Sequence, residues 1–235
     1  MKLSRRSFVG SVSAIGAGVA TIGTLGASHE ADGQIVYMPG DWHGAEFDKL
    51  CKSKARVKQV FDATSLAEGG PLSPIKNSFN GLQFGYSVPP DQIKIVAALR
   101  GQANLLNFDD SMWEKYKLGE YTKTDDPKTK APAVRNVFYA KDAALTSTNV
   151  NDKTSVYQDY SIEALCGRGM TMLSCHNATM HQAAGIVRRF SLSVMPDEVT
   201  KDLQAHMLPG CISVPAMVAA VAMLQCDGKY AYTMG

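Results

Sequence analysis

Short apolar runs alternate with helical patterns through the second half of the chain, and this alternation constrains the fold more than any other feature. The run IKIVAAL, residues 93–99, is almost continuously apolar and rich in β-branched side chains, which is typical of a strand buried on both faces of a sheet. Four more strands are predicted at residues 57–63, 170–175, 211–215 and 228–234. Because strands that alternate with helices form βαβ units, the sequence predicts one three-layer α/β domain with a mostly parallel sheet.

Helices are predicted between these strands from capping residues and apolar spacing. Ser73 is expected to cap a helix that has Pro74 at its first position, where proline is favoured. The remaining helices are predicted at residues 157–169, 177–190, 196–208 and 216–225. The stretch at about 111–156 is polar, lysine-rich and broken by prolines, which indicates an insertion across the surface with a short hairpin near residues 134–140. We therefore assign residues 57–235 to one domain that carries this insertion.

The N-terminus carries the most specific motif in the chain. SRRSFVG, residues 4–10, has the form of a twin-arginine signal: a serine, two arginines, a free position, phenylalanine and an apolar residue. A mildly apolar run follows, and small residues at 26–28 suit peptidase cleavage. We predict a signal peptide at 1–27, an arm at 28–56, and export to the periplasm by the twin-arginine machinery. If the leader is not cleaved, the alternative is a membrane-tethered protein with the same domain outside.

The charge balance argues against nucleic acid as a partner. Removal of the predicted leader takes away Lys2, Arg5 and Arg6, which leaves 21 basic and 22 acidic side chains and a net charge of −1. Phosphate binding needs a basic surface, which this composition does not supply. The sequence therefore predicts a globular domain without a nucleic-acid function.

Five cysteines lie outside the predicted leader. They form no CxxC or CxxCH motif, which argues against a zinc ribbon, a thioredoxin-type dithiol and attached c-type haem. An odd number in an oxidising compartment leaves at least one thiol unpaired, and the disulfide pairing stays open. Cys166 lies near a predicted helix C-terminus, where the helix dipole disfavours a thiolate. Cys211 and Cys226 border apolar segments and are expected to be packing residues, whereas Cys51 falls in the polar arm.

Cys175 differs from the other four in its predicted place in the sheet. It ends the strand MTMLSC, and in open parallel sheets function gathers at the carboxyl ends of strands. Asn177 is predicted to cap the following helix, whose free N–H groups and dipole favour a thiolate on the cysteine. His176, if charged or donating a hydrogen bond, would act in the same direction. Such a thiolate can hold sulfane sulfur as a persulfide or exchange with a disulfide, while the alternative is a small side chain packed in the core.

Three polar residues near Cys175 are candidates for substrate binding. Arg100 and Asn104 follow the strand IKIVAAL, and a guanidinium at that position can bind an anionic sulfur compound. Asn177, the predicted cap of the next helix, is the third. The predicted site therefore has Cys175 and His176 as catalytic residues, with these three residues around the substrate.

A metal or haem site is another interpretation of the same region. It would combine Cys175 and His176 with other soft or nitrogen ligands, namely His181, His206, Met180 and Met207. His176 and His181 are five residues apart, so on a helix they lie about 140° from each other and do not share one face. We therefore predict no metal site and no cofactor, with haem or metal binding as the less favoured alternative.

Four blocks follow one another along the chain: IKIVAALRGQANLL, ALCGRGMTMLSCHNAT, LPGCISVPAMVAAVAMLQ and the closing DGKYAY. Together they resemble the DsrE/DsrF-like family of sulfur-relay proteins, over about residues 57–64 and 92–235 apart from the insertion. The resemblance implies a flavodoxin-like α/β fold, a trimeric or hexameric assembly and, in the sulfur-trafficking members, a persulfide-carrying cysteine at the position of Cys175. The predicted leader and the long insertion depart from the family, whose sulfur-relay members are cytoplasmic.

The sequence as a whole predicts an exported sulfur-handling protein that carries or transfers sulfane sulfur on Cys175. Its expected partners are a sulfur compound or a sulfur-carrier protein, and further copies of itself. The alternative from a different class is a non-catalytic binding or assembly module with a structural cysteine, in which the apolar helix AMVAAVAMLQ forms a subunit interface. The sulfur donor and acceptor stay open.

Overall fold

The computed structural model of the protein describes residues 42–235. The predicted signal peptide at 1–27 and the arm up to residue 41 lie outside the described residues. Within residues 42–235, no helix combines the length and the apolar character that crossing a membrane requires.

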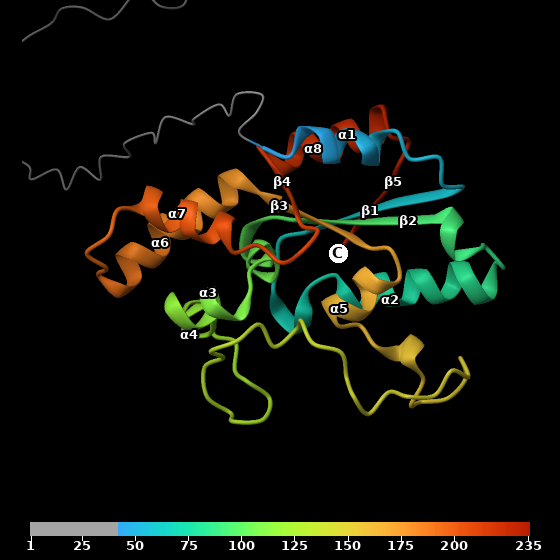
Figure 1. Ribbon diagram of the computed structural model, residues 1–235, viewed down its shortest axis with the longest axis horizontal. Coiled ribbons are helices and arrows are strands. Elements are labelled where there is room, and N and C mark those ends of the chain that lie inside the picture. Colours follow the sequence, from blue (N-terminus) through green and yellow to red (C-terminus); the bar gives the residue numbers. More distant parts are fainter. Residues whose placement is uncertain (1–41) are drawn as a thin grey trace, which may run out of the picture. The chain divides into compact units, whose positions relative to one another are not determined.

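Five parallel strands form one sheet at the centre of the domain (Figure 1). They are β1 (Val57–Ala63), β2 (Ile93–Leu99), β3 (Thr171–Cys175), β4 (Ile212–Val214) and β5 (Ala231–Met234). Their order across the sheet is β4-β3-β2-β1-β5, and each neighbouring pair is parallel. The predicted three-layer α/β architecture of the flavodoxin-like class is confirmed, and the predicted bounds of β1 and β2 coincide with the observed ones.

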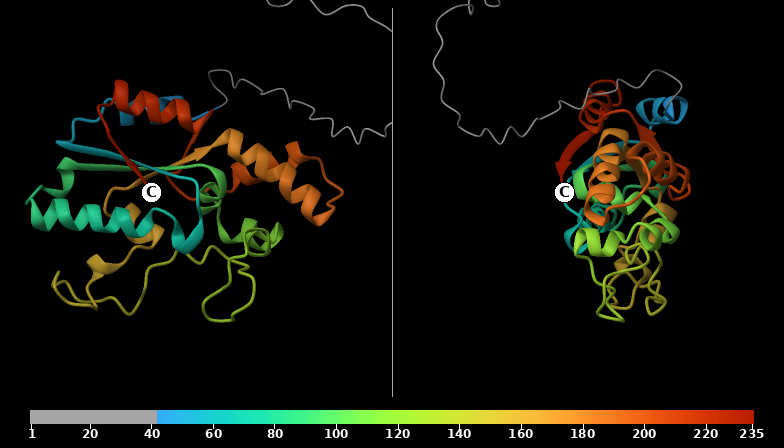
Figure 2. Two further views of the ribbon diagram at one scale, coloured as in Figure 1. Left: turned by 180° about the vertical axis from the view of Figure 1, so that it is seen from behind. Right: turned by 90° about the vertical axis from the view of Figure 1, so that its left-hand side faces the viewer.

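Two helices, α1 (Gly44–Cys51) and α8 (Met217–Cys226), lie side by side on one face of the sheet (Figures 1 and 2). Alternate strand side chains point to this face and pack beneath the two helices, because successive residues of a strand face opposite sides. The residue before α1 also binds the edge strand β4: the His43 N–H donates to the Ser213 carbonyl at 3.2 Å, and the Ser213 N–H donates to His43 Nδ1 at 3.0 Å. The part of the predicted arm that the structure describes is thus packed on the sheet.

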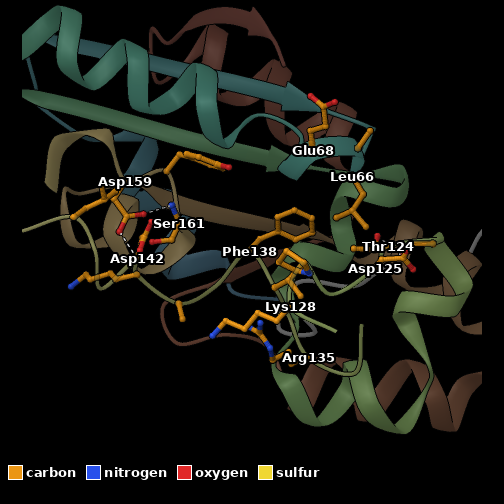
Figure 3. Close-up of a pocket in the computed structure, with 18 of the residues that line it drawn as sticks. Leu66, Glu68, Thr124, Asp125, Lys128, Arg135, Phe138, Asp142, Asp159 and Ser161 are labelled. Atoms are coloured by element: carbon orange, nitrogen blue, oxygen red, sulfur yellow. Dashed lines mark hydrogen bonds between the residues drawn. The ribbon is translucent and has the colours of Figure 1, made fainter. Parts of the chain in front are cut away.

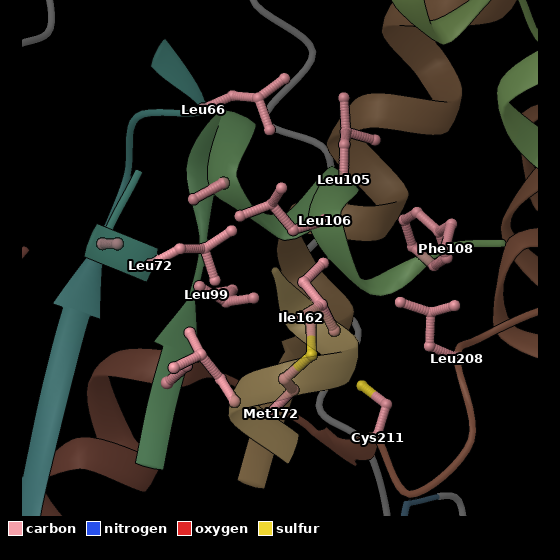
Figure 4. Close-up of a cluster of buried hydrophobic side chains, with 14 of the residues drawn as sticks. Leu66, Leu72, Leu99, Leu105, Leu106, Phe108, Ile162, Met172, Leu208 and Cys211 are labelled. Atoms are coloured by element: carbon pink, nitrogen blue, oxygen red, sulfur yellow. The ribbon is translucent and has the colours of Figure 1, made fainter. Parts of the chain in front are cut away.

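The other face of the sheet holds a larger apolar cluster (Figure 4). It is covered by α2 (Leu72–Asn80), α5 (Ile162–Gly167), α6 (His176–Phe190), α7 (Pro196–Ala205) and the 3₁₀ helix η4 (Gly101–Asn107). Shorter turns complete the connections: η1 (Ala67–Gly69), the π-helical η2 (Gly81–Gly85), η3 (Pro90–Gln92) and η5 (Val156–Gln158). In α2, Leu72, Ile75 and Phe79 recur at helical spacing and are buried, so this helix places one apolar stripe on the sheet.

Part of the insertion is buried in the core, although the whole insertion was predicted to cross the surface. It begins with two short helices, α3 (Asp110–Lys115) and α4 (Leu118–Thr122), which place Trp113 and Leu118 in the apolar cluster with no exposed surface. The hairpin predicted near residues 134–140 is wrong, because this segment has no strand and forms turns. The irregular part follows α4 and extends to α5.

Several predicted helix ends are corrected by the structure. The helix predicted to be capped by Ser73 begins two residues earlier, at Leu72 instead of Pro74, so Ser73 lies inside α2. The single helix predicted at 157–169 is two pieces, η5 and α5, because Ser161 caps a new helix with its side chain. Asn177 is not the cap of α6, since that helix already begins at His176.

Candidate functional site at the carboxyl edge of the sheet

The carboxyl ends of β3 and β4 lead to helices that pack on opposite sides of the sheet. α6 follows β3 and places Ala183 and Ile186 in the cluster that includes α2, whereas α8 follows β4 and packs on the other face. Open parallel sheets bind ligands where the connections from neighbouring strands diverge in this way. Cys175, the last residue of β3, lies at this point.

Cys175 lies between the starts of two helices. It directly precedes α6, and its Sγ accepts a hydrogen bond from the backbone N–H of Met217, the first residue of α8, at 3.4 Å. Unpaired N–H groups and the dipole at a helix N-terminus favour negative charge. The side chain is 6% exposed and belongs to the apolar cluster beneath α8. The sulfur therefore accepts a hydrogen bond at the start of a helix and has only a narrow opening to solvent.

Asn104 holds the backbone around Cys175 in place. This residue of η4 has no exposed surface, and its Oδ1 accepts from the Cys175 N–H at 2.8 Å and from the Ser174 hydroxyl at 3.1 Å. Its Nδ2 donates to Thr179 Oγ1 and to Gln182 Oε1, both at 3.0 Å and both on α6. One amide thus joins the exit of β2, the end of β3 and the first turns of α6. These bonds give Asn104 a positioning role, and its predicted contact with substrate stays a prediction.

Strand register brings Arg100 level with Cys175. Leu99 pairs with Ser174 across β2 and β3, so the next residue on each strand is Arg100 and Cys175. Side chains on neighbouring strands that share a register position lie on the same face, here the one covered by α8. Arg100 and Cys175 therefore follow the paired ends of neighbouring strands and face the same side of the sheet.

The guanidinium of Arg100 is oriented by a carboxylate from the next strand. Arg100 Nε donates to Asp62 Oδ1 at 2.8 Å and Nη2 donates to Oδ2 at 3.1 Å, which is a bidentate pair. The Tyr232 hydroxyl of β5 also donates to Asp62 Oδ2, at 3.1 Å. The hydrogen bond to Asp62 is the main reason that the pKa of Arg100 is raised, and the charges of Asp62, Tyr232 and Cys175 add to it. A fixed cation therefore lies within electrostatic range of the sulfur.

The other two predicted residues occupy different surroundings. His176 is buried, and its Nδ1 accepts from Gln204 Nε2 of α7 at 2.6 Å. The backbone N–H of Asn177 donates to the Pro215 carbonyl at 3.4 Å, which joins the start of α6 to the exit of β4. Both residues hold the β3–α6 junction against its neighbours, and their predicted catalytic and binding roles stay predictions.

All five cysteines are free thiols, and three of them have a raised pKa. Burial raises the pKa of Cys166 to about 11 and raises that of Cys211, so both favour the thiol. The pKa of Cys51 is raised by burial and by the charge of Asp227. Cys211 is a buried packing residue as predicted, but the same prediction for Cys226 is wrong, because this last residue of α8 is exposed.

Two residues of the site were not found from the sequence. Asp62 carried a usable signal, because it is a lone carboxylate near the carboxyl end of an otherwise apolar strand end, VFDA. Tyr232 carried none, since its contact with Asp62 depends on β5 pairing with β1 rather than with β4. Strand order is therefore the missing information for Tyr232.

Metal ligation and known relatives give no further assignment of this site. In the part of the chain that the structure describes, no group of three or more His, Cys, Asp or Glu side chains is placed to hold a metal ion. No protein-family model, curated protein or solved structure matches the chain. The geometry around Cys175 is therefore the remaining indication of function.

Proposed function

We propose that the protein is an exported sulfur handler that carries sulfane sulfur as a persulfide on Cys175. The observation that carries this proposal is the hydrogen bond from the Met217 N–H to Cys175 Sγ at the start of α8. A donor at a helix N-terminus stabilises the terminal charge of a thiolate or of a persulfide anion. No other cysteine of the chain lies at the carboxyl end of a strand in this arrangement within residues 42–235.

The proposed chemistry is a sulfur transfer to the thiolate. Cys175 Sγ attacks the sulfane sulfur of a donor such as thiosulfate, a new S–S bond forms, and the S–S bond of thiosulfate breaks with its electron pair on the departing sulfite. Arg100, held by Asp62, binds the anionic donor and stabilises the charge on the leaving group. In the onward transfer, the thiolate of the acceptor attacks the outer sulfur of the persulfide, a new S–S bond forms on the acceptor, and the old S–S bond breaks with its electron pair on Cys175.

The resemblance to sulfur-relay proteins and the twin-arginine motif support the remaining parts of this proposal. The motif SRRSFVG supports export to the periplasm, where the partner is a sulfur compound or a sulfur-carrier protein. The same resemblance supports a homo-oligomer, either a trimer or a hexamer. Fractionation of cells that express the full chain tests the export: replacing Arg5 and Arg6 by lysine is expected to keep the protein in the cytoplasm.

Intact mass spectrometry tests the carrier role directly. Reduced protein is incubated with thiosulfate or polysulfide, and the wild type is expected to gain the mass of one sulfur atom. Cys226→Ser, which removes an exposed thiol, is expected to gain it as well, whereas Cys175→Ser is expected to gain none. The carrier role is refuted if the wild type gains nothing, or if a Cys175→Ser variant with unchanged circular dichroism still gains sulfur.

A second candidate function is a non-catalytic binding or assembly module with a structural cysteine. The observation that favours it is the burial of Cys175 among the apolar side chains beneath α8. Alkylation of the native protein separates the two candidates. If Cys175 reacts with a small reagent only after unfolding, at the same stage as Cys211, the structural role is favoured.

A further inference from the structure

A cavity of about 880 Å³ lies beneath the insertion, away from Cys175 (Figure 3). Its walls come from the loop after β1 at residues 66–68, from Gln102, and from parts of the insertion within residues 122–145 and 158–161. Cavities of about 300–1,000 Å³ are typical of sites for small organic ligands. Cys175 is not among the lining residues, so this cavity is separate from the proposed sulfur site.

The floor of the cavity is apolar and rests on the core. Phe138 and Leu66 both line the cavity. The Phe138 ring packs edge-on against Trp113, with 6.4 Å between ring centroids, and Trp113 has no exposed surface. A ligand that lies on Phe138 would therefore meet a fixed aromatic surface.

The charged side chains around this floor are balanced in sign. The cations are Lys123, Lys128, Arg135 and Lys141. The carboxylates are Glu68, Asp125, Asp142 and Asp159. In Figure 3, Lys128 and Arg135 lie on one side of Phe138, and Asp142 and Asp159 lie on another. Arg135 and Lys141 are also paired with Asp126 and Glu163, which do not line the cavity. A ligand with charge of one sign would still face side chains of both signs, whereas a ligand with both charges can satisfy both walls.

An ion pair orients one wall, and backbone hydrogen bonds orient the other. Arg135 Nε lies 2.9 Å from Asp126 Oδ2 in an ion pair, which orients the guanidinium. The buried carboxylate of Asp159 accepts from the backbone N–H groups of Ser161, at 2.8 Å, and Asp142, at 3.0 Å. Groups fixed before binding lose little conformational entropy when a ligand arrives.

We propose that this cavity binds a short peptide or a related small zwitterion. The ligand's carboxylate reaches Lys128 and Arg135, its ammonium group reaches Asp142 and Asp159, and an apolar side chain covers Phe138. The proposal concerns a second site and stands independently of sulfur transfer on Cys175.

Calorimetry with a matched set of dipeptides tests the proposal. The probes are a dipeptide of leucine and phenylalanine, its N-acetylated form and its C-terminal amide. The free dipeptide is expected to bind, and each blocked form to bind about tenfold more weakly, because each has lost one charge-assisted contact. In a Trp42→Phe variant Trp113 is the sole tryptophan, and its fluorescence is expected to change on binding because it contacts Phe138.

Paired variants identify the two walls. Lys128→Gln is expected to weaken binding of the free dipeptide about tenfold and to leave binding of the C-terminal amide unchanged. Asp142→Asn is expected to weaken binding of the free dipeptide about tenfold and to leave binding of the N-acetylated form unchanged. Lys153→Gln and Asp91→Asn, exposed substitutions outside the cavity, serve as controls with unchanged affinity. The proposal is overturned if the free dipeptide does not bind, if the blocked forms bind equally well, or if the controls weaken binding as much as the wall variants.

Discussion

Two arginine–aspartate pairs with similar distances and exposures lie in two different regions of the molecule. Arg100 and Asp62, at the carboxyl edge of the sheet, are 2.8 Å apart, with side chains 36% and 8% exposed. Arg135 and Asp126, in the insertion, are 2.9 Å apart, with side chains 35% and 9% exposed. Distance and exposure are alike in the two pairs, but Arg100 donates a hydrogen bond to each oxygen of Asp62.

The surroundings of the two pairs make the difference. Asp62 and Arg100 belong to neighbouring strands, so the register of the sheet sets where the guanidinium lies relative to Cys175. Asp126 instead accepts from the Lys128 N–H at 2.8 Å, and its arginine lies nine positions further along the same loop. The Arg100–Asp62 pair is positioned by the register of the sheet, and the Arg135–Asp126 pair joins two positions of one loop. An ion pair thus takes its role from the backbone that carries it.

The largest expected effect tests whether the insertion contributes to the stability of the core. Trp113→Ala removes a fully buried side chain of α3 and is expected to lower the free energy of unfolding by about 4 kcal/mol. Leu145→Ala, in the irregular part of the same insertion and only half-buried, is expected to cost about 1 kcal/mol. Urea unfolding measures both. If both variants lose only a little free energy of unfolding, the insertion as a whole contributes little to the stability of the core.

The next effect concerns the polar network that holds the edge of the sheet. Asn104→Leu keeps the size of the side chain but leaves the Cys175 N–H, Thr179 and Gln182 without their partner, and is expected to cost about 3 kcal/mol. The same substitution at Asn151, an exposed residue of the insertion, is expected to stay within about 0.5 kcal/mol. Urea unfolding compares the two variants. Equal costs would contradict the positioning role of Asn104.

The regular region was predictable from sequence because burial in a sheet leaves a strong local signal. The bounds of β1 and β2 follow from apolar, β-branched runs, and the start of α6 was displaced by one residue only. This placement of strand ends was enough to select Cys175. The placement of strand ends did not predict the contact between Asp62 and Tyr232, because that contact depends on which strands are neighbours in the sheet.

The insertion and α8 show why the rest was not predictable. Trp113 and Leu118 lie on helices of six and five residues, too short for apolar periodicity to appear, and polar neighbours hide them. α8 is apolar on nearly all sides, so its sequence does not distinguish the buried Leu224 from the exposed Cys226. Tertiary contacts decide burial in both cases.

Exchanging the two arginines for glutamine compares the two pairs directly. Arg100→Gln is expected to slow persulfide formation from thiosulfate about tenfold, because the donor loses a charge-assisted contact beside Cys175. Arg135→Gln is expected to leave that rate unchanged and to weaken dipeptide binding instead. Mass spectrometry of samples quenched at successive times measures persulfide formation in each variant, and calorimetry measures dipeptide binding. If both variants affect both activities equally, the two regions do not act as separate sites.

The smallest expected effect is the acid dependence of the loop pair. The hydrogen bond from the Lys128 N–H, followed by the charge of Arg135, lowers the pKa of Asp126 below its ordinary value. A carboxyl group whose folded pKa lies below the unfolded one, about 3.9, stabilises the folded state above that pH and loses this contribution as the pH falls through the folded pKa. Asp126→Asn keeps an acceptor for the Lys128 N–H but cannot ionise. The difference in unfolding free energy between wild type and variant is therefore expected to be constant near neutral pH and to shrink below about pH 4. A difference that does not change with acid would show that the loop is held by its backbone hydrogen bonds alone, and that Arg135 is oriented for another purpose.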